Sequence, residues 1–148
     1  MQTKEFFFDK KKIPENLIIY ETEYSICFIC LNPIISGQVI VSSKRKIERF
    51  EKLDLTEATD IWICASKISK VLQKYLECSS FTFALNDGPY SNQLFKHSHL
   101  NIIPRKVDDK FSKNNDELYS QLEKFQPEID IEEAVKFASI FKKVLNEI

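Results

Sequence analysis

The amino-acid sequence predicts an α+β protein in which helices pack on an antiparallel sheet. Strand-like segments follow one another along the first 43 residues, and a long stretch with apolar residues at helical spacing covers about 56–77. Two more strand-like segments then precede two helical stretches near the C-terminus. The chain has 148 residues and no internal repeat, so we predict one domain over 1–148.

Strands come first along the chain. Residues 5–8, 16–21, 24–31 and 37–43 have strand-like content, and the stretch NPIISG between the last two has the Pro, Ser and Gly of a turn. We therefore expect an antiparallel meander of four strands.

The first predicted helix covers about 56–77. Asp54 and Glu57, three residues apart, form the pattern of a capping box. Apolar residues then recur at the spacing of one helical face, which we expect to be buried: Ile61, Cys64, Ala65, Ile68, Val71, Leu72, Tyr75 and Leu76.

The remaining elements follow the same reasoning. Residues 79–86 read as a strand, DGPYSN as a loop, and 97–103 as a strand ended by Pro104. The polar segment 106–114 is predicted to be a mobile loop, and helices are predicted over 115–125 and 131–147.

Composition narrows the class of protein. With 43% apolar and 29% charged residues the chain is typical of soluble globular proteins. The net charge of -1 offers no broad basic surface for nucleic acid, although small anions remain possible ligands. The opening MQTKEFFFDKKK is too short and too charged for a signal peptide or a membrane span, so we expect a cytoplasmic protein.

The four cysteines, Cys27, Cys30, Cys64 and Cys78, fit a reducing compartment. Cys27 and Cys30 have the C-x-x-C spacing of zinc and redox sites, but they lie in a predicted strand, where positions i and i+3 point to opposite faces. Two thiols on opposite faces cannot hold one ion, and a second C-x-x-C is missing. We predict no bound metal.

Both histidines of the chain lie in the stretch QLFKHSHLNIIPRK. On a strand His97, His99 and Asn101 share one face, while Ser98 and Leu100 belong to the other. A solvent-exposed edge or a hydrogen-bonded core position would explain a single histidine. Two neighbouring imidazoles instead favour nucleophilic and proton-transfer chemistry near neutral pH.

The loop upstream of the histidines suits a phosphate. Asn86 and Gln93 supply amide donors, and backbone N–H groups around Gly88 are able to form an anion-binding cradle. By itself this segment is equally typical of an ordinary Asp-Gly-Pro turn.

The stretch NQLFKHSHLNIIPRK resembles the signature of the histidine triad (HIT) superfamily, in which a phosphate loop leads into His-x-His-x-His on a strand. The wider sequence is similar to the fragile histidine triad branch of dinucleoside polyphosphate hydrolases. The similarity includes ETEYS, NPIISGQVIV, ERFEKLDLTEATDIW, FTFALNDGP and NDELYSQLEKF, in the order of that branch.

This resemblance implies a homodimer with a continuous antiparallel sheet and a nucleotidyl-histidine mechanism. His99 matches the nucleophile that attacks the α-phosphorus and releases AMP, and His97 matches a residue that contacts phosphate oxygens. It also implies that Mg²⁺ accompanies the substrate. The positions that match phosphate-binding residues are Asn86, Asn92, Gln93, Leu94 and Phe95.

Three residues depart from the pattern of the family. Asn101 replaces the third histidine, and an amide cannot transfer a proton. Asn92 stands where the loop usually has Gly, and Cys30 stands where an Asn or Asp binds the ribose. Residues at the family's base pocket read equally well as core: Phe8, Ile13, Phe28 and Ile40. Tyr119 matches a loop tyrosine.

Three functions follow from these residues. The expected one is hydrolysis of diadenosine triphosphate or a close relative. Loss of the third histidine also permits a nucleotide-binding sensor or adaptor with little turnover. A related nucleotidyl hydrolysis or transfer, for example on an adenylated amine, is the third.

Overall fold

The computed structural model describes residues 5–122, 124 and 126–148. These residues form a five-stranded antiparallel sheet in the order β3 (Ile18–Glu21), β4 (Ser25–Ile29), β5 (Val39–Ser43), β7 (His99–Arg105) and β6 (Ser80–Ala84). A hairpin of β1 (Phe6–Phe8) and β2 (Lys11–Ile13) forms a separate sheet. The α-helices are α1 (Leu55–Leu76), α2 (Asn115–Gln121) and α3 (Ile131–Asn146), and short 3-10 helices are Glu15–Leu17, Phe50–Lys52 and Pro89–Ser91.

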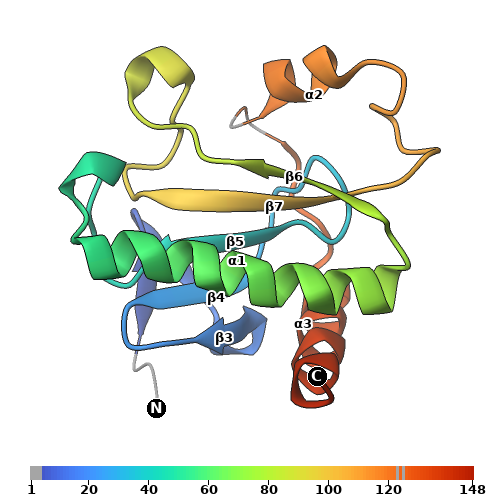
Figure 1. The fold of residues 1–148 in the computed structure, drawn as a ribbon, viewed down its shortest axis with the longest axis horizontal. Coiled ribbons are helices and arrows are strands. Elements are labelled where there is room, and N and C mark those ends of the chain that lie inside the picture. The colour runs from blue at the N-terminus through green and yellow to red at the C-terminus, as the bar shows by residue number, and fades with distance from the viewer. Residues whose placement is uncertain (1–4, 123, 125) are drawn as a thin grey trace.

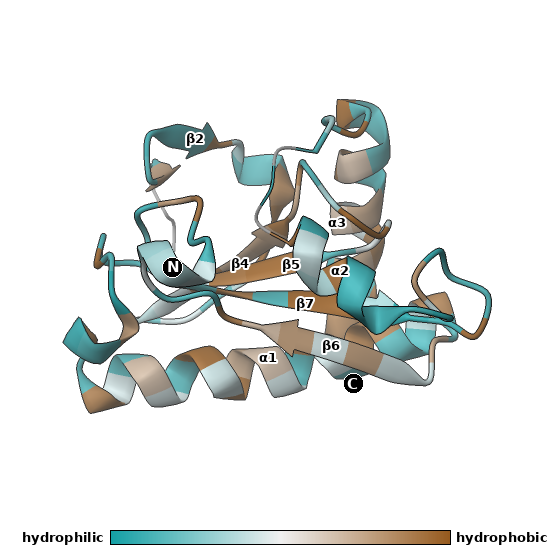
Figure 2. Ribbon diagram, turned by 90° about the horizontal axis from the view of Figure 1, so that it is seen from above, coloured by the Kyte–Doolittle hydropathy of each residue, from teal (hydrophilic) through white to brown (hydrophobic). Residues whose placement is uncertain are grey.

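The elements lie in layers around the five-stranded sheet. Helix α1 runs across one face, against β4, β5 and β7, and α3 packs beside α1 and β3 (Figure 1). The hairpin lies on the opposite side of the sheet from α1, and the central strands between them are strongly hydrophobic (Figure 2). The prediction of an α+β fold with an antiparallel sheet is confirmed.

Helix α1 follows its sequence pattern closely. The backbone N–H of Asp54 donates a hydrogen bond of 3.0 Å to the Glu57 carboxylate, as a capping box requires. Of the eight residues predicted to face the core, Tyr75 is 38% exposed and Leu76 is partly buried. The other six are buried against the sheet: Ile61, Cys64, Ala65, Ile68, Val71 and Leu72.

The predicted meander of four strands is wrong in its first member. Segment 5–8 turns back on itself at Asp9, whose φ of 55° lies in the left-handed region, and pairs with β2 instead of joining the sheet. Asp tolerates this conformation better than most residues, which allows a tight turn without glycine. The strand Lys11–Ile13 was missed because its two lysines read as polar loop.

The strand that carries the histidines is also shifted. It was predicted over 97–103 and ended by Pro104, but β7 begins at His99 and continues through Pro104 to Arg105. Pairing with β5 stops at Ile102, so Pro104 lies where β7 pairs with β6 alone among the described strands. Helix α2 ends at Gln121, and the predicted end of this helix includes 123 and 125, which lie outside the described residues.

The segment 106–114 is tied to the sheet through Asp109 and Phe111. The Asp109 carboxylate accepts hydrogen bonds from Arg105 Nε (2.8 Å) and from the backbone N–H of Phe111 (2.9 Å). The hydrogen bond from Arg105 lowers the pKa of Asp109 to about 2. Phe111 is buried with Leu118 beneath α2. The mobility of this segment stays a prediction.

Across the described part of the chain, no helix is both long enough and apolar enough to cross a membrane.

Candidate active site

A cleft of about 410 Å³ lies on the side of the sheet that faces the β1–β2 hairpin, a size suited to a small organic ligand. The hairpin, the ends of β4 and β5 and the loop before β7 form its walls, together with four residues that precede α3: Leu122, Lys124, Gln126 and Glu128. Residues predicted as base pocket or as core line it together: Phe8, Ile13, Phe28 and Ile40. Each of these four is also buried, so both readings describe the same side chains.

The cleft brings together part of the predicted site. Its lining includes Cys30, Leu94, Phe95, His99 and Asn101. Four other predicted residues lie outside its lining: Asn86, Asn92, Gln93 and His97. The functional roles of all these residues stay predictions.

His97 is fully buried and does not line the cleft. Its Nε2 lies 2.6 Å from the carbonyl oxygen of Ser43, and its Nδ1 lies 3.5 Å from the backbone nitrogen of Asp9. Because a carbonyl only accepts, Nε2 carries the proton and Nδ1 accepts from the Asp9 N–H. Burial lowers the pKa of His97, in spite of the hydrogen bond to Ser43, so this ring is neutral near pH 7.

This buried imidazole predicts a loss of stability in mild acid. The pKa of His97 is lower in the folded chain than its ordinary value of 6.5, so the unfolded chain binds the extra proton. Its contribution to stability is therefore fully present above pH 6.5 and falls as the pH drops below it. We expect the temperature of the thermal midpoint to be lower at pH 5.5 than at pH 7.5.

The neighbouring charges keep this test specific to His97. His99 and Lys46 oppose its protonation and Asp9 favours it, while the ordinary pKa of Asp is 3.8, below the tested range. In His97→Gln the same thermal scans should be flatter between these two pH values. An equal slope in both chains would assign the effect to other groups.

The orientation of the His99 imidazole is set by a backbone carbonyl. Its Nδ1 lies 2.8 Å from the carbonyl oxygen of His97, so Nδ1–H donates and the lone pair of the neutral ring lies on Nε2. The Phe8 ring meets the imidazole edge-on, with centroids 4.9 Å apart, and Phe95 lies beside it at 6.2 Å. If Nε2 forms a bond, the positive charge on the ring strengthens the bond from Nδ1–H to the carbonyl.

Asn101 occupies the third position of the motif and belongs to a network of amides. Gln38 Nε2 donates to Asn101 Oδ1 (2.9 Å), and Asn101 Nδ2 donates to the carbonyl of Ala84 (3.4 Å). Gln38 Oε1 in turn accepts from the backbone N–H of Ile34 (2.9 Å). Sequence reasoning missed Gln38, since only the pairing of β5 with β7 places it beside Asn101.

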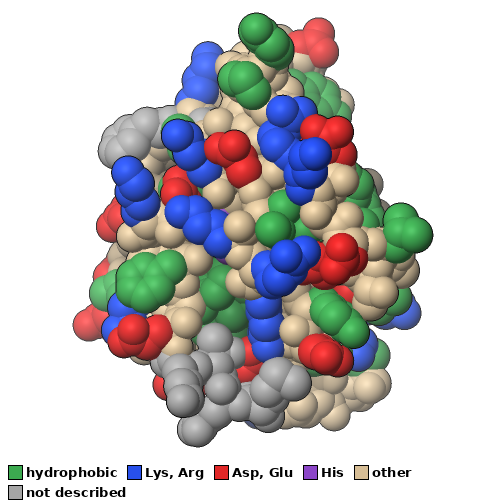
Figure 3. All heavy atoms as spheres, turned by 90° about the vertical axis from the view of Figure 1, so that its left-hand side faces the viewer, with side chains coloured by type: hydrophobic (Ala, Val, Ile, Leu, Met, Phe, Trp, Pro, Cys, Tyr) green, Lys and Arg blue, Asp and Glu red, His purple; other side chains and the backbone are tan. Residues whose placement is uncertain are grey.

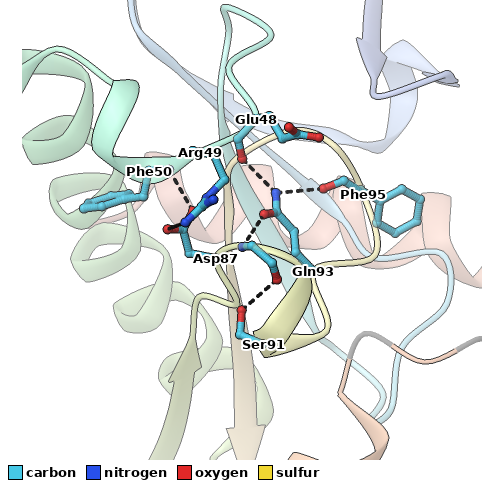
Figure 4. Close-up of polar contacts among 8 residues, drawn as sticks. Glu48, Arg49, Phe50, Asp87, Ser91, Gln93 and Phe95 are labelled. Atoms are coloured by element: carbon cyan, nitrogen blue, oxygen red, sulfur yellow. Dashed lines mark hydrogen bonds and ion pairs between the residues drawn. The ribbon is translucent and has the colours of Figure 1, made fainter.

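The loop between β6 and β7 is braced by Gln93 (Figure 4). Its Nε2 donates to the carbonyls of Glu48 (2.8 Å) and Phe95 (2.9 Å), and its Oε1 accepts from the Gly88 N–H (2.7 Å). The Gln93 side chain was predicted to donate to phosphate, but both of its amide hydrogens are donated to backbone carbonyls. Its contribution to a phosphate site is therefore the shape of the loop.

A second brace joins this loop to the segment before α1. The Asp87 carboxylate accepts from the backbone N–H of Phe50 (2.8 Å) and from Arg49 Nη2 (3.2 Å), as drawn in Figure 4. Gly88 has a φ of 92°, and a Cβ there would lie 3.0 Å from the Arg49 guanidinium. The glycine therefore serves both the backbone conformation and the close approach of Arg49.

The structure explains one departure from the family pattern. Asn92 has a φ of 61°, in the left-handed region that favours glycine and that Asn tolerates best among the other residues. Asn92 thus preserves the backbone shape that the usual Gly provides.

The two cysteines of CFIC point to opposite sides of the sheet, as predicted. Cys30 lines the cleft, whereas Cys27 is buried toward α1. Burial and a hydrogen bond with Cys64 raise the pKa of the Cys27 thiol. Among the residues that the structure describes, no three His, Cys, Asp or Glu side chains are grouped so as to hold a metal ion.

The antiparallel sheet thus presents His99 to a cleft whose size suits a small organic ligand. The chain belongs to the HIT domain family, whose sequence profile matches residues 10–108. This confirms the family resemblance found in the sequence.

Two curated relatives cover most of the chain. A bis(5'-adenosyl)-triphosphatase of Dictyostelium discoideum is 34% identical over 141 residues, which are 95% of this chain and 93% of the relative. A bifunctional bis(5'-adenosyl)-triphosphatase/adenylylsulfatase of Arabidopsis thaliana is 35% identical and covers 84% of this chain and 68% of its own length.

Solved structures share the fold. The diadenosine triphosphate hydrolase of Plasmodium falciparum, in complex with cyclomarin A, superposes with a TM-score of 0.84 at 22% identity and covers 99% of this chain and 88% of its own. The NitFhit protein of C. elegans superposes with a TM-score of 0.81 at 26% identity, over 97% of this chain and 31% of its own.

Proposed function

We propose that this chain hydrolyses dinucleoside polyphosphates of the diadenosine triphosphate type, with His99 as the nucleophile. The observation that carries the proposal is the Nδ1–H bond from His99 to the His97 carbonyl, which leaves the lone pair of the neutral ring on Nε2, on a residue that lines the cleft of about 410 Å³. Relatives at 34% and 35% identity over most of the chain are named bis(5'-adenosyl)-triphosphatases. The chain is a hydrolase of this class.

The reaction divides into two displacements. In the first, Nε2 of His99 forms a bond to the α-phosphorus, the P–O bond to the departing nucleotide breaks, and its electron pair stays on that oxygen. In the second, water forms the new P–O bond, the N–P bond breaks with its electron pair returning to Nε2, and the proton of the water passes to solvent. AMP is the product of this second step.

Mg²⁺ belongs to the substrate in this proposal. Polyphosphates carry Mg²⁺ into nucleotide sites, because hard cations prefer phosphate oxygens and bind through few protein groups. Residues of the cleft would then orient the polyphosphate around His99.

The assay follows directly: the purified chain, incubated with diadenosine triphosphate and Mg²⁺, should release AMP and ADP in equal amounts. Chromatography of the products and titration of binding distinguish the alternatives. Binding without AMP would favour the sensor or adaptor. AMP from an adenylated amine, but none from diadenosine triphosphate, would favour the related nucleotidyl hydrolase.

We further propose that the chain forms a homodimer through β6 and α1. Strand β6 is at the edge of the sheet and pairs, among the described strands, with β7 only. Two aromatic side chains that contact each other remain half-exposed there: Phe83 of β6 (42%) and Trp62 of α1 (46%), with ring centroids 6.4 Å apart. An edge strand beside exposed aromatic rings favours pairing with a second copy.

Light scattering should therefore give about twice the chain mass of 17.4 kDa. Phe83→Arg should shift the protein toward the monomer, because a charge replaces an apolar contact. Tyr90→Arg is the matched control, since Tyr90 is fully exposed and lies in the 3-10 helix Pro89–Ser91, outside β6 and α1. A monomer in the unmodified chain would exclude this assembly.

A cytoplasmic location is also a proposal. All four cysteines fall within the described residues and are free thiols, which suits a reducing compartment. The face drawn in Figure 3 mixes basic, acidic and apolar side chains rather than gathering one charge. That mixture supports the expectation that neither nucleic acid nor a membrane surface is a partner.

A further inference from the structure

The cleft is lined beside His99 by an amide that the protein holds in place. Asn101 accepts from Gln38 at one end (2.9 Å) and donates to the Ala84 carbonyl at the other (3.4 Å), and both amide side chains are buried. The bond from the Ile34 N–H fixes which end of Gln38 faces Asn101. An amide does not titrate near neutral pH, so this pair cannot release a proton.

Asn101 is also the nearest neighbour of His99 on the polar face of β7 that the cleft reaches. It lies two residues along the strand, at a spacing of about 7 Å, and both side chains line the cleft. His97, on the other side of His99, is fully buried and uses both ring nitrogens in hydrogen bonds to Ser43 and Asp9.

Among the described residues, two carboxyl groups line the cleft, those of Asp9 and Glu128, and neither is a proton donor. Burial raises the pKa of Asp9, but the hydrogen bond from the Lys96 N–H and the charge of Lys46 lower it by more. The hydrogen bond from Lys11 lowers the pKa of Glu128, with which Lys11 forms a 2.8 Å ion pair. Both carboxyl groups are therefore ionised when the enzyme works near neutral pH.

We propose that the fixed Gln38–Asn101 pair restricts this chain to substrates whose departing group leaves as a stable anion. The proposal rests on the function assigned to His99. As the N–P bond forms, the bond from phosphorus to the departing atom breaks and its electron pair leaves unprotonated. Phosphoanhydrides and the mixed anhydride of AMP with sulfate satisfy this requirement. Adenosine phosphoramidates do not, because their amine must gain a proton to leave.

The test uses leaving groups of rising basicity on one nucleotide. AMP release would be measured from the para-nitrophenyl, para-chlorophenyl and phenyl esters of AMP, from adenosine 5'-phosphoramidate, and from diadenosine triphosphate with Mg²⁺. We expect kcat/KM to fall steeply along the ester series. The phosphoramidate should be cleaved about 100-fold or more slowly than diadenosine triphosphate, which is the lower end of what a general acid contributes.

Each outcome of this comparison decides between the proposals. If diadenosine triphosphate is cleaved but the ester series is flat, or the phosphoramidate is an equally good substrate, a proton donor acts and the inference is wrong. Lys11 and Lys124, which also line the cleft, would be the first residues to replace in that case. If diadenosine triphosphate itself yields no AMP, the proposed function fails, and the inference fails with it.

Two substitutions at one position separate proton donation from shape. Asn101→His supplies an ionisable group, and the rate on the phenyl ester relative to the para-nitrophenyl ester should rise about tenfold or more. Asn101→Leu introduces a side chain of similar size that has no ionisable group. In this variant kcat/KM should fall along the ester series as steeply as in the unmodified chain. A ratio within one variant does not depend on how much of it is folded. An unchanged ratio in a folded Asn101→His would count against the inference.

Discussion

His99→Asn is expected to lower kcat for diadenosine triphosphate by about 10⁴-fold or more, because the substitution removes the atom that bonds to phosphorus. The choice of Asn is dictated by the geometry. The Nδ2–H of an asparagine is able to replace Nδ1–H of His99 as the donor to the His97 carbonyl, a bond of 2.8 Å in the structure. The shape of the strand and of the cleft should therefore survive while the nucleophilic Nε2 is lost.

Three measurements complete this experiment. Calorimetric titration with AMP should give an affinity close to that of the unmodified chain, since binding does not require the covalent bond. Thermal scans should show that the variant is folded. Mass spectrometry after an alkaline quench, in which the N–P bond is stable, should detect a nucleotidyl adduct in the unmodified chain and none in His99→Asn. Should the variant retain the original rate, the assignment of His99 and the covalent mechanism would both be wrong.

Phe8→Ala should be the most destabilising of the substitutions considered, at about 3–5 kcal/mol, the range measured when a buried Phe is truncated. Phe8 is 2% exposed, and its ring lies between the hairpin and the sheet. Ring centroids of four neighbours lie within 5.4 Å of it: Phe28 (5.3 Å), Phe95 (4.8 Å), His97 (5.4 Å) and His99 (4.9 Å). The substitution would leave a cavity against both imidazoles.

The adjacent residue provides the matched control. Phe7 is 48% exposed, because side chains alternate along β1, and Phe7→Ala should change the free energy of unfolding by less than about 0.5 kcal/mol. Urea denaturation of both variants measures the difference. Phe8→Ala should also lower kcat at a temperature where it is folded, because His99 loses the ring that limits its rotation. Equal effects of the two substitutions would mean that the hairpin does not pack on the sheet in solution.

Periodicity was sufficient to predict most of the fold. The regular spacing of Ile61, Cys64, Ile68 and Leu72 defines α1 without tertiary information, because a helix buries one face at 3.6 residues per turn. Periodicity failed at the β1–β2 hairpin, where the reversal depends on Asp9 entering the left-handed region. It also failed at Pro104. A proline is tolerated there because the pairing of β7 with β5 stops at Ile102.

The candidate site was predictable where its residues lie on one strand. His99 and Asn101 could be placed together because two residues along a strand share a face. The partners that hold Asn101 and His97 could not be predicted in the same way. Gln38 reaches Asn101 across 63 positions of sequence, and Asp9 reaches His97 across 88, so only the folded chain brings each pair into contact.

The hairpin also changes what should be regarded as the unit of this protein. The family profile begins at residue 10, within the turn, whereas Phe8 and Asp9 lie before that boundary and pack on or bond to His97. A polypeptide that started at the profile boundary would retain every strand of the main sheet and both histidines, yet it would lack Phe8 and Asp9, which line the cleft from the hairpin. The limits of the family profile and the limits of the folded domain therefore differ at the N-terminal side. Recombinant production should include the whole hairpin rather than begin at the profile boundary.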